Sequence, residues 1–178
     1  MNSFVTLATA INRHPRPACD PALIAFAMFH SKRDSLGLWT FALTSGSAST
    51  IDEEIVAMTV LADTLPWPTV LIARSPQTAI YQPLMHVADL APAPLKFHLA
   101  GRVARAFGAI VVDLDAGIPA PPRSIGARDP DTLRDVLRCE VIDDWLAFLR
   151  GAGGQNTEAV KAATGAWLAK RGDTRRQS

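Results

Sequence analysis

Residues 22–44 read ALIAFAMFHSKRDSLGLWTFALT, two apolar runs separated by a polar segment. Ala22–Phe29 is too short to span a membrane but long enough to cross a sheet, so it is predicted to be the first strand. Ser31–Ser35 has the composition of a polar turn, and Leu36–Thr44 is predicted to be a second strand. These residues therefore predict a β-hairpin.

The segment after the hairpin predicts a helix that leads directly into another strand. Ser45–Ser49 is expected to be a flexible connection, and Thr50–Glu53 forms a capping box at the start of the helix. The predicted buried stripe of this helix is Ile51, Ile55, Met58, Ala62 and Leu65. The short apolar strand Thr69–Ala73 follows at once, a pattern typical of an α/β sheet with helices on both faces.

The remaining elements follow from prolines, glycines and apolar periodicity. In chain order they are helices Leu84–Leu90 and Leu95–Phe107, strand Ala109–Leu114, loop Asp115–Pro130, helix Asp131–Arg150 capped by Asp129, helix Thr157–Arg171 and a basic, frayed tail. We expect residues 1–150 to form the main domain and residues 151–178 to be a C-terminal helix and tail.

Composition gives few indications of function. The chain has 178 residues and a formal net charge of +1, so no overall charge attracts it to a polyanion. Cys19 and Cys139 lack metal-ligand spacing and are expected to be reduced. The N-terminal residues resemble neither a signal peptide nor a membrane span, and we expect the protein to be cytoplasmic.

Four acids are the candidate chemical groups. Projection of Asp131–Arg150 at 100° per residue puts Glu140 and Asp144 among its apolar side chains, where a carboxylate needs a partner. Asp113 and Asp115 end an apolar strand, a common position for ligand-facing residues. We therefore consider Asp113, Glu140 and Asp144 as catalytic candidates. Asp113, Asp115 and Glu140 would be ligands of Mg²⁺ or Mn²⁺ if the protein is active.

A structural role for the same acids is the favoured alternative. The later part of the helix is apolar on both sides, so Glu140 can lie at a seam and pair with a nearby arginine. Asp113 can simply brace the loop that follows it. Lys32, Arg33, Arg123 and Arg128 are candidate nucleic-acid contacts, although a solvated surface is the commoner explanation of such basic clusters.

The order of the elements resembles the ribonuclease H-like fold, and more narrowly the DEDD-type 3′–5′ exonucleases related to the proofreading domain of family B polymerases. Val136–Arg150 (VLRCEVIDDWLAFLR) is similar to the final helix of that family, and Ala109–Gly117 (AIVVDLDAG) to its preceding strand. Thr69–Leu84 is similar in position to the second motif. The resemblance implies a central first strand, antiparallel to its hairpin partner, with the long helix packed across it.

The departures from that family imply catalytic degeneracy. No acid occurs in Ala22–Ser31, where the first motif has two, and Tyr81 stands near the expected aspartate of the second motif. Glu140 and Val136 replace the aspartate and tyrosine of the third motif. Metal-assisted phosphodiester cleavage needs several convergent carboxylates, and at most one of the four is present.

Three functions are compatible with these observations. The first is a catalytically degenerate domain, with no resident cofactor, that binds DNA, RNA or a replication, repair or mobile-element protein. The second is a protein-interaction module without a nucleic-acid role. The third is an active nuclease with a rearranged site of Asp113, Asp115, Glu140 and Asp144. We rank them in that order.

Overall fold

The structure, a computed structural model, describes residues 3–12, 16, 19–64, 70–76, 86–87, 90, 101, 110–116, 129–152 and 155–175. Five strands form one mixed sheet in the order β3-β2-β1-β4-β5. The strands are β1 (Ser3–Ile11), β2 (Leu23–Arg33), β3 (Trp39–Ser47), β4 (Val70–Ala73) and β5 (Ile110–Asp113). β1, β2 and β3 are antiparallel neighbours, whereas β4 and β5 run parallel to β1.

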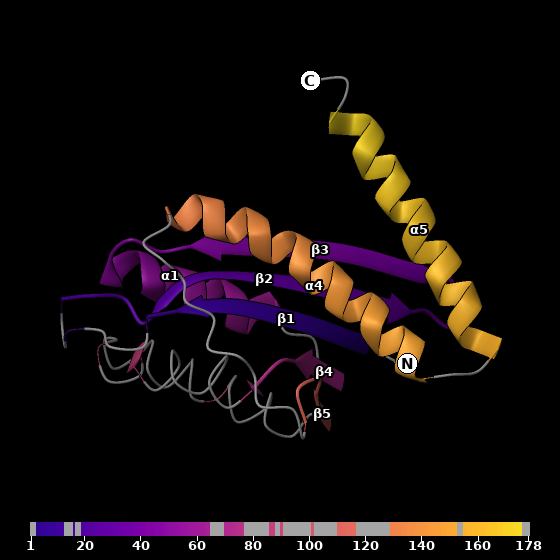
Figure 1. Cartoon of the computed structure of the whole chain (residues 1–178), viewed down its shortest axis with the longest axis horizontal. Coiled ribbons are helices and arrows are strands. Elements are labelled where there is room, and N and C mark those ends of the chain that lie inside the picture. The colour runs from indigo at the N-terminus through magenta and orange to yellow at the C-terminus, as the bar shows by residue number, and fades with distance from the viewer. Residues whose placement is uncertain are drawn as a thin grey trace.

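Helices cover both faces of this sheet (Figure 1). Helix α1 (Ile51–Thr64) packs on the face that carries Val5, Leu7 and Met28. The long helix α4 (Pro130–Ala152) crosses the other face, where Trp145 packs with Phe4 and Phe29. Alternate strand residues point to opposite faces, which is why one strand supplies both cores. The predicted α/β class, a mixed sheet with helices on both faces, is confirmed.

The prediction that Ala22–Phe29 is the first strand is wrong, because β1 (Ser3–Ile11) precedes it in the chain. β1 lies between β2 and β4, in the centre of the sheet. Part of the expected arrangement is present, because the central strand β1 is antiparallel to β2 and α4 packs across both. The strand that fills the central place is β1, and the predicted first strand is its hairpin partner.

The predicted β2–β3 hairpin forms, but its turn lies further along the chain than expected. β2 continues through Arg33, so Ser31–Arg33 are strand residues rather than turn residues. Ser45–Ser47, expected to be a flexible connection, are the last residues of β3. Gly37 has a φ of 84° in the turn, a conformation that glycine adopts without strain. The Asp34 carboxylate accepts hydrogen bonds from the amides of Leu36 and Leu38.

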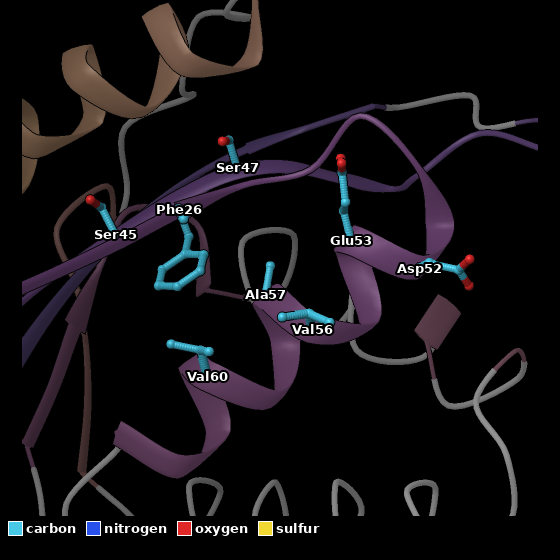
Figure 2. A pocket seen from close by; sticks show the side chains of 9 residues that line it. Phe26, Ser45, Ser47, Asp52, Glu53, Val56, Ala57 and Val60 are labelled. Carbon is cyan, nitrogen blue, oxygen red and sulfur yellow. The ribbon is translucent and has the colours of Figure 1, made fainter.

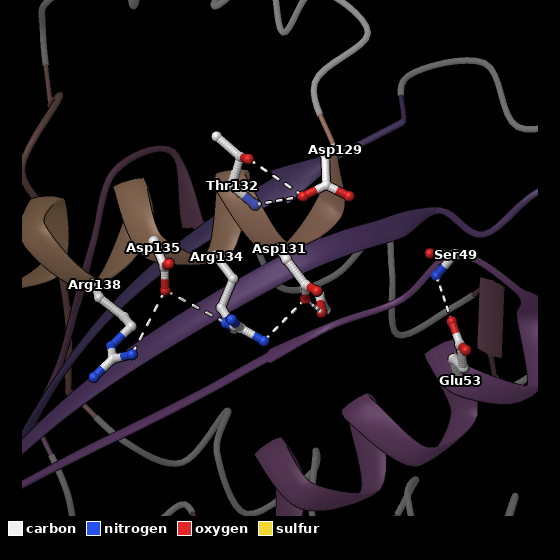
Figure 3. A network of polar contacts seen from close by, with 9 residues as sticks. Ser49, Glu53, Asp129, Asp131, Thr132, Arg134, Asp135 and Arg138 are labelled. Carbon is white, nitrogen blue, oxygen red and sulfur yellow. Dashed lines mark hydrogen bonds and ion pairs between the residues drawn. The ribbon is translucent and has the colours of Figure 1, made fainter. Parts of the chain in front are cut away.

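Both predicted helix caps are present (Figure 3). The Thr50 hydroxyl accepts a hydrogen bond from the Glu53 amide at 3.2 Å, and Glu53 accepts one from the Ser49 amide at 2.7 Å. At the start of α4, the Asp129 carboxylate accepts a hydrogen bond from the Thr132 amide at 3.0 Å. Each cap satisfies amides that lack an intrahelical acceptor.

The buried stripe of α1 differs from the predicted one. Among its described side chains, the buried ones are Glu54, Ala57, Met58 and Leu61. Ile55 is partly buried against this core, and Met58 is the predicted member that is fully buried. Ala62 and Leu65 lie outside the residues whose side chains the structure describes. The helix is therefore rotated so that Glu54 faces the sheet.

The last helix is longer than predicted. α5 runs from Gln155 to Arg175 rather than ending at Arg171. Trp167 packs edge-on against Phe29 with ring centroids 5.4 Å apart, and the buried Thr164 hydroxyl accepts a hydrogen bond from Trp145 Nε1. α5 is thus tied to the sheet and to α4 through aromatic side chains. The predicted helices Leu84–Leu90 and Leu95–Phe107 lie almost entirely outside the described residues.

Candidate functional site

The candidate site lies where β4 and β5 end. In sheets with parallel strands, ligands commonly bind at the carboxyl ends of those strands. Arg74 and Ser75 follow β4 directly, and Asp113 is the last residue of β5. Helix α4 brings Asp144 to the same place, although Asp144 is only 2% exposed. Residues from three elements therefore meet at this end of the sheet.

Arg74 is the centre of the site because its guanidinium joins two acids from different elements. Its Nε donates to Asp144 Oδ1 at 2.8 Å, and its Nη1 donates to Asp115 Oδ1 at 3.0 Å. The hydrogen bond with Asp144 is the main reason that the pKa of Arg74 is raised. The Arg74 side chain is 39% exposed, compared with 12% for Asp115. One side of the cluster is thus open to solvent through the arginine.

Asp113 fixes the backbone around this cluster. Its Oδ1 accepts hydrogen bonds from the Ser75 amide at 3.2 Å and from the Asp115 amide at 2.9 Å. Ser75 has a φ of 46°, a left-handed conformation that is strained for a residue other than glycine. Such strain persists only where the surroundings hold it. These contacts support the structural interpretation of Asp113, as a brace for the loop.

Asp144 retains an acceptor that no described residue uses. Both contacts of Arg74 with Asp144 are made to Oδ1, through Nε and Nη2. Oδ2 is buried and accepts no hydrogen bond from any described residue. Buried carboxylate oxygens without a donor are rare, because removal from water is then uncompensated. Among the described residues, the cluster therefore has an unsatisfied acceptor beside a solvent-accessible guanidinium.

The predicted acids come together only in part. Asp113, Asp115 and Asp144 share the cluster around Arg74, whereas Glu140 lies one helical turn before Asp144 on α4 and is half-buried. In the part of the chain that the structure describes, no group of three or more Asp, Glu, His or Cys side chains is arranged to hold a metal ion. The place between Asp115 and Asp144 is taken by a guanidinium. These residues therefore do not fit a resident divalent cation.

The predicted basic contacts lie at the opposite end of the sheet. Lys32 pairs with Ser3 in the strand register, whereas the charged cluster follows Ala73, which pairs with Leu7. No carboxylate among the described residues pairs with Lys32 or Arg33. Arg33 Nε instead donates to the Gly37 carbonyl at 3.3 Å. Arg123 and Arg128 lie outside the described residues.

His30 is a partly buried titratable residue at that basic end. Its Nε2 lies 2.9 Å from the Ser3 hydroxyl. Its pKa is lowered, mainly by burial and additionally by the positive charge of Lys32. The imidazole is thus held neutral next to a cation that no described carboxylate neutralises.

Sequence reasoning missed Glu54, a buried carboxylate on the other face of the sheet. Glu54 Oε1 accepts hydrogen bonds from the Leu23 amide at 2.7 Å and the Ala22 amide at 3.1 Å. Burial nevertheless raises its pKa, and these amide hydrogen bonds offset part of that effect. The sequence contains a pattern that could have identified it. Glu54 lies three, four and seven residues before Ala57, Met58 and Leu61, the spacing of residues on one face of a helix.

Comparisons with known proteins support no statement about function. No protein-family model matches the chain, and no curated protein matches it. The crystal structure of RNase H1 from the halophilic archaeon Halobacterium salinarum NRC-1 is similar at 16% identity and a TM-score of 0.32, over 81% of this chain and 99% of that chain. Likeness at that level carries no argument about activity. None of the described helices is long and apolar enough to cross a membrane.

Proposed function

We propose that this protein is a catalytically degenerate nuclease-like domain that binds nucleic acid. The observation that carries the proposal is the position of Arg74, whose guanidinium bridges Asp115 and Asp144. A divalent cation that activates water needs convergent carboxylates with free oxygens. Here the convergent carboxylates already hold a fixed cation of the protein. Such an arrangement favours ion pairing over metal-assisted hydrolysis.

The proposed contact with nucleic acid is the basic end of β2. Lys32 and Arg33 have no carboxylate partner among the described residues, whereas Arg134 and Arg138 on α4 pair with Asp131 and Asp135 (Figure 3). Cations without a carboxylate partner can neutralise phosphates and release counterions, which strengthens binding at low salt. A domain with a net charge of +1 would bind through such a local patch.

The catalytic half of the proposal is tested with 3′-labelled single- and double-stranded DNA and RNA in Mg²⁺ or Mn²⁺. We expect no cleavage above that of the Asp144→Asn variant. Cleavage by the wild type that is lost in both Asp144→Asn and Glu140→Ala would overturn the proposal. It would establish instead the active nuclease with a rearranged acidic site.

The binding half is tested by fluorescence anisotropy with a labelled single-stranded oligonucleotide across a salt series. Arg33→Glu should weaken binding about tenfold and flatten the salt dependence, because roughly one phosphate contact is lost. Arg150→Glu is the matched control, since it makes the same change of charge on an exposed residue of α4. Equal weakening by the two variants, or no binding at low salt, would contradict the proposed surface.

A further inference from the structure

A second surface lies on the opposite side of the molecule from α4, in a groove between β3 and α1. Its volume is about 350 Å³. It is lined by Phe26, Ser45, Gly46, Ser47, Asp52, Glu53, Val56, Ala57 and Val60. Figure 2 shows the Phe26 ring and the side chains of Ala57, Val56 and Val60 around the same space. The lining is thus mainly apolar, with two acids of α1 at one end.

Gly46 keeps this groove open. A Cβ atom at position 46 would lie 2.7 Å from Cε1 of Phe26, closer than real contacts allow. The ring therefore lies directly against the backbone of β3. Ser45 and Ser47 point away from α1 (Figure 2), and the Ser47 hydroxyl donates to Asp131 on α4. Around Gly46, β3 contributes backbone rather than side chains to the groove.

The groove presents apolar surface to solvent. Val56 is 63% exposed and Val60 is 40% exposed, although both lie on the side of α1 that borders the groove. A single exposed valine needs no explanation, but two adjacent ones beside a hollow form a surface on which another apolar group can bury area. Burial of such surface is favourable by about 25 cal/mol per Å².

β3 adds a second means of recognition, because it is an edge strand. It pairs with β2 on one side, and no described strand pairs with its other side. The outer backbone groups of an edge strand bind an extended segment as an additional strand. Alternate side chains of that segment would point to the face on which α1 and the groove lie.

The acidic residues at one end of the groove favour a bound segment that carries a positive charge. Asp52 and Glu53 lie at the first turn of α1, and the Asp52 carboxylate points outward in Figure 2. Glu53 already accepts the Ser49 amide, so Asp52 is the better partner for an incoming cation. We propose that β3 and this groove bind an extended segment of a partner protein, with aliphatic side chains at alternate positions and a lysine or arginine next to Asp52.

The test uses the full-length ¹⁵N-labelled chain and a synthetic peptide, acetyl-Lys-Thr-Val-Thr-Val-Thr-Val-amide, in which the lysine and the valines share one face of an extended strand. We expect amide chemical shifts to change along β3 and the first half of α1. Val60→Asp should weaken binding at least tenfold. Val136→Asp is the matched control, because Val136 is 44% exposed on α4, away from the groove, and this variant should bind as the wild type does.

Three results of the peptide titration would overturn this proposal. They are the absence of binding at millimolar peptide, binding that Val60→Asp leaves unchanged, and shift changes confined to other elements. Val56→Asp is a second variant in case Val60→Asp does not fold. If the chain is a dimer in gel filtration and Val60→Asp makes it monomeric, the occupant is a second copy and the partner assignment is wrong. Oligonucleotide binding should be the same in both groove variants, so this test is independent of the proposed function.

Discussion

The two faces of the sheet each bury a carboxylate, and the main hydrogen-bond donors to it differ. On the α1 face, Glu54 accepts hydrogen bonds from the backbone amides that begin β2. On the α4 face, Asp144 is bound by the Arg74 guanidinium. Backbone amides at the start of a strand inside the sheet cannot move away without disrupting the sheet. The Arg74 side chain, in contrast, is 39% exposed to solvent.

The two faces also differ in the side chains that form their cores. The core on the α1 face is mainly aliphatic, with residues such as Leu7, Met58 and Leu61. The α4 face packs aromatic rings, with Trp145 at 5.7 Å from Phe4 and 6.0 Å from Phe29. Asp144 lies next to Trp145 in sequence, at the margin of this cluster. Glu54 is therefore a structural group of the core, whereas Asp144 is a group at the border between the core and an open site.

The largest expected effect is that of Glu54→Ala. This substitution leaves the Ala22 and Leu23 amides without an acceptor and creates a cavity, so the free energy of unfolding should fall by about 3 kcal/mol. Urea unfolding followed by circular dichroism measures the change. Asp52→Ala is the control from the same helical turn, and it should cost less than about 0.5 kcal/mol because Asp52 is exposed. Similar losses in the two variants would show that Glu54 is not a structural group of the core.

Arg74→Ala should have the next largest effect, a fall of about 2 kcal/mol in the free energy of unfolding. It leaves the Asp144 carboxylate, which is 2% exposed, without a counter-ion. Solvent that enters beside the truncated residue limits the loss. The double variant Arg74→Ala/Asp144→Asn should recover about 1 kcal/mol, because it removes the uncompensated charge. If the two single effects simply add, Arg74 and Asp144 are not energetically coupled, and the interpretation of this site is wrong.

Two glycines allow a tightly packed position to be compared with an open one. Gly46→Ala should destabilise the protein by about 1–2 kcal/mol, because the new methyl group collides with the buried Phe26 ring. Gly165, on α5, has open space where an added Cβ would lie, with nothing within 4 Å of it. Gly165→Ala should therefore stabilise the protein by about 1 kcal/mol through helix propensity. Thermal unfolding of both variants measures the two shifts, which should have opposite signs.

The smallest expected effect is a pH dependence that belongs to Glu54. Its pKa is raised in the folded protein, so the folded state binds this proton more tightly than the unfolded state does. The stability contributed by protonated Glu54 is complete below the unfolded pKa of about 4.3 and is lost as the pH rises through the folded pKa. Compared with Glu54→Gln, the wild type should therefore lose stability as the pH is raised from about 4 to about 7. The opposite trend would show that the amide hydrogen bonds dominate.

The order of the later elements could be predicted from local patterns, whereas β1 could not. The apolar runs that became β2, β4 and β5 are short and continuous, and the caps at Thr50 and Asp129 mark both helix starts. β1 is buried on both faces, so it shows no alternation, and its Thr and Ala residues hide the apolar run that usually marks such a strand.

The candidate site was predictable in its acids but not in its arginine. Asp144 was placed on the inward side of its helix by projection alone, and it is buried. Arg74 follows an apolar strand like many surface residues, and its partners Asp115 and Asp144 are 41 and 70 residues away in sequence. No local pattern contains such a pairing, because only the parallel register of β4 with β5 and the path of α4 bring these residues together.

The central position of β1 has a consequence for the order in which the sheet forms and opens. Its antiparallel neighbour β2 is close in sequence, and β2 and β3 extend the same meander. Its parallel neighbour β4 pairs Val70 with Phe4, so that half of the sheet must close a much longer loop. We expect the amides of β4 and β5 to exchange with deuterium faster than those of β1 and β2. The charged site would then stand on the half of the sheet that opens most readily.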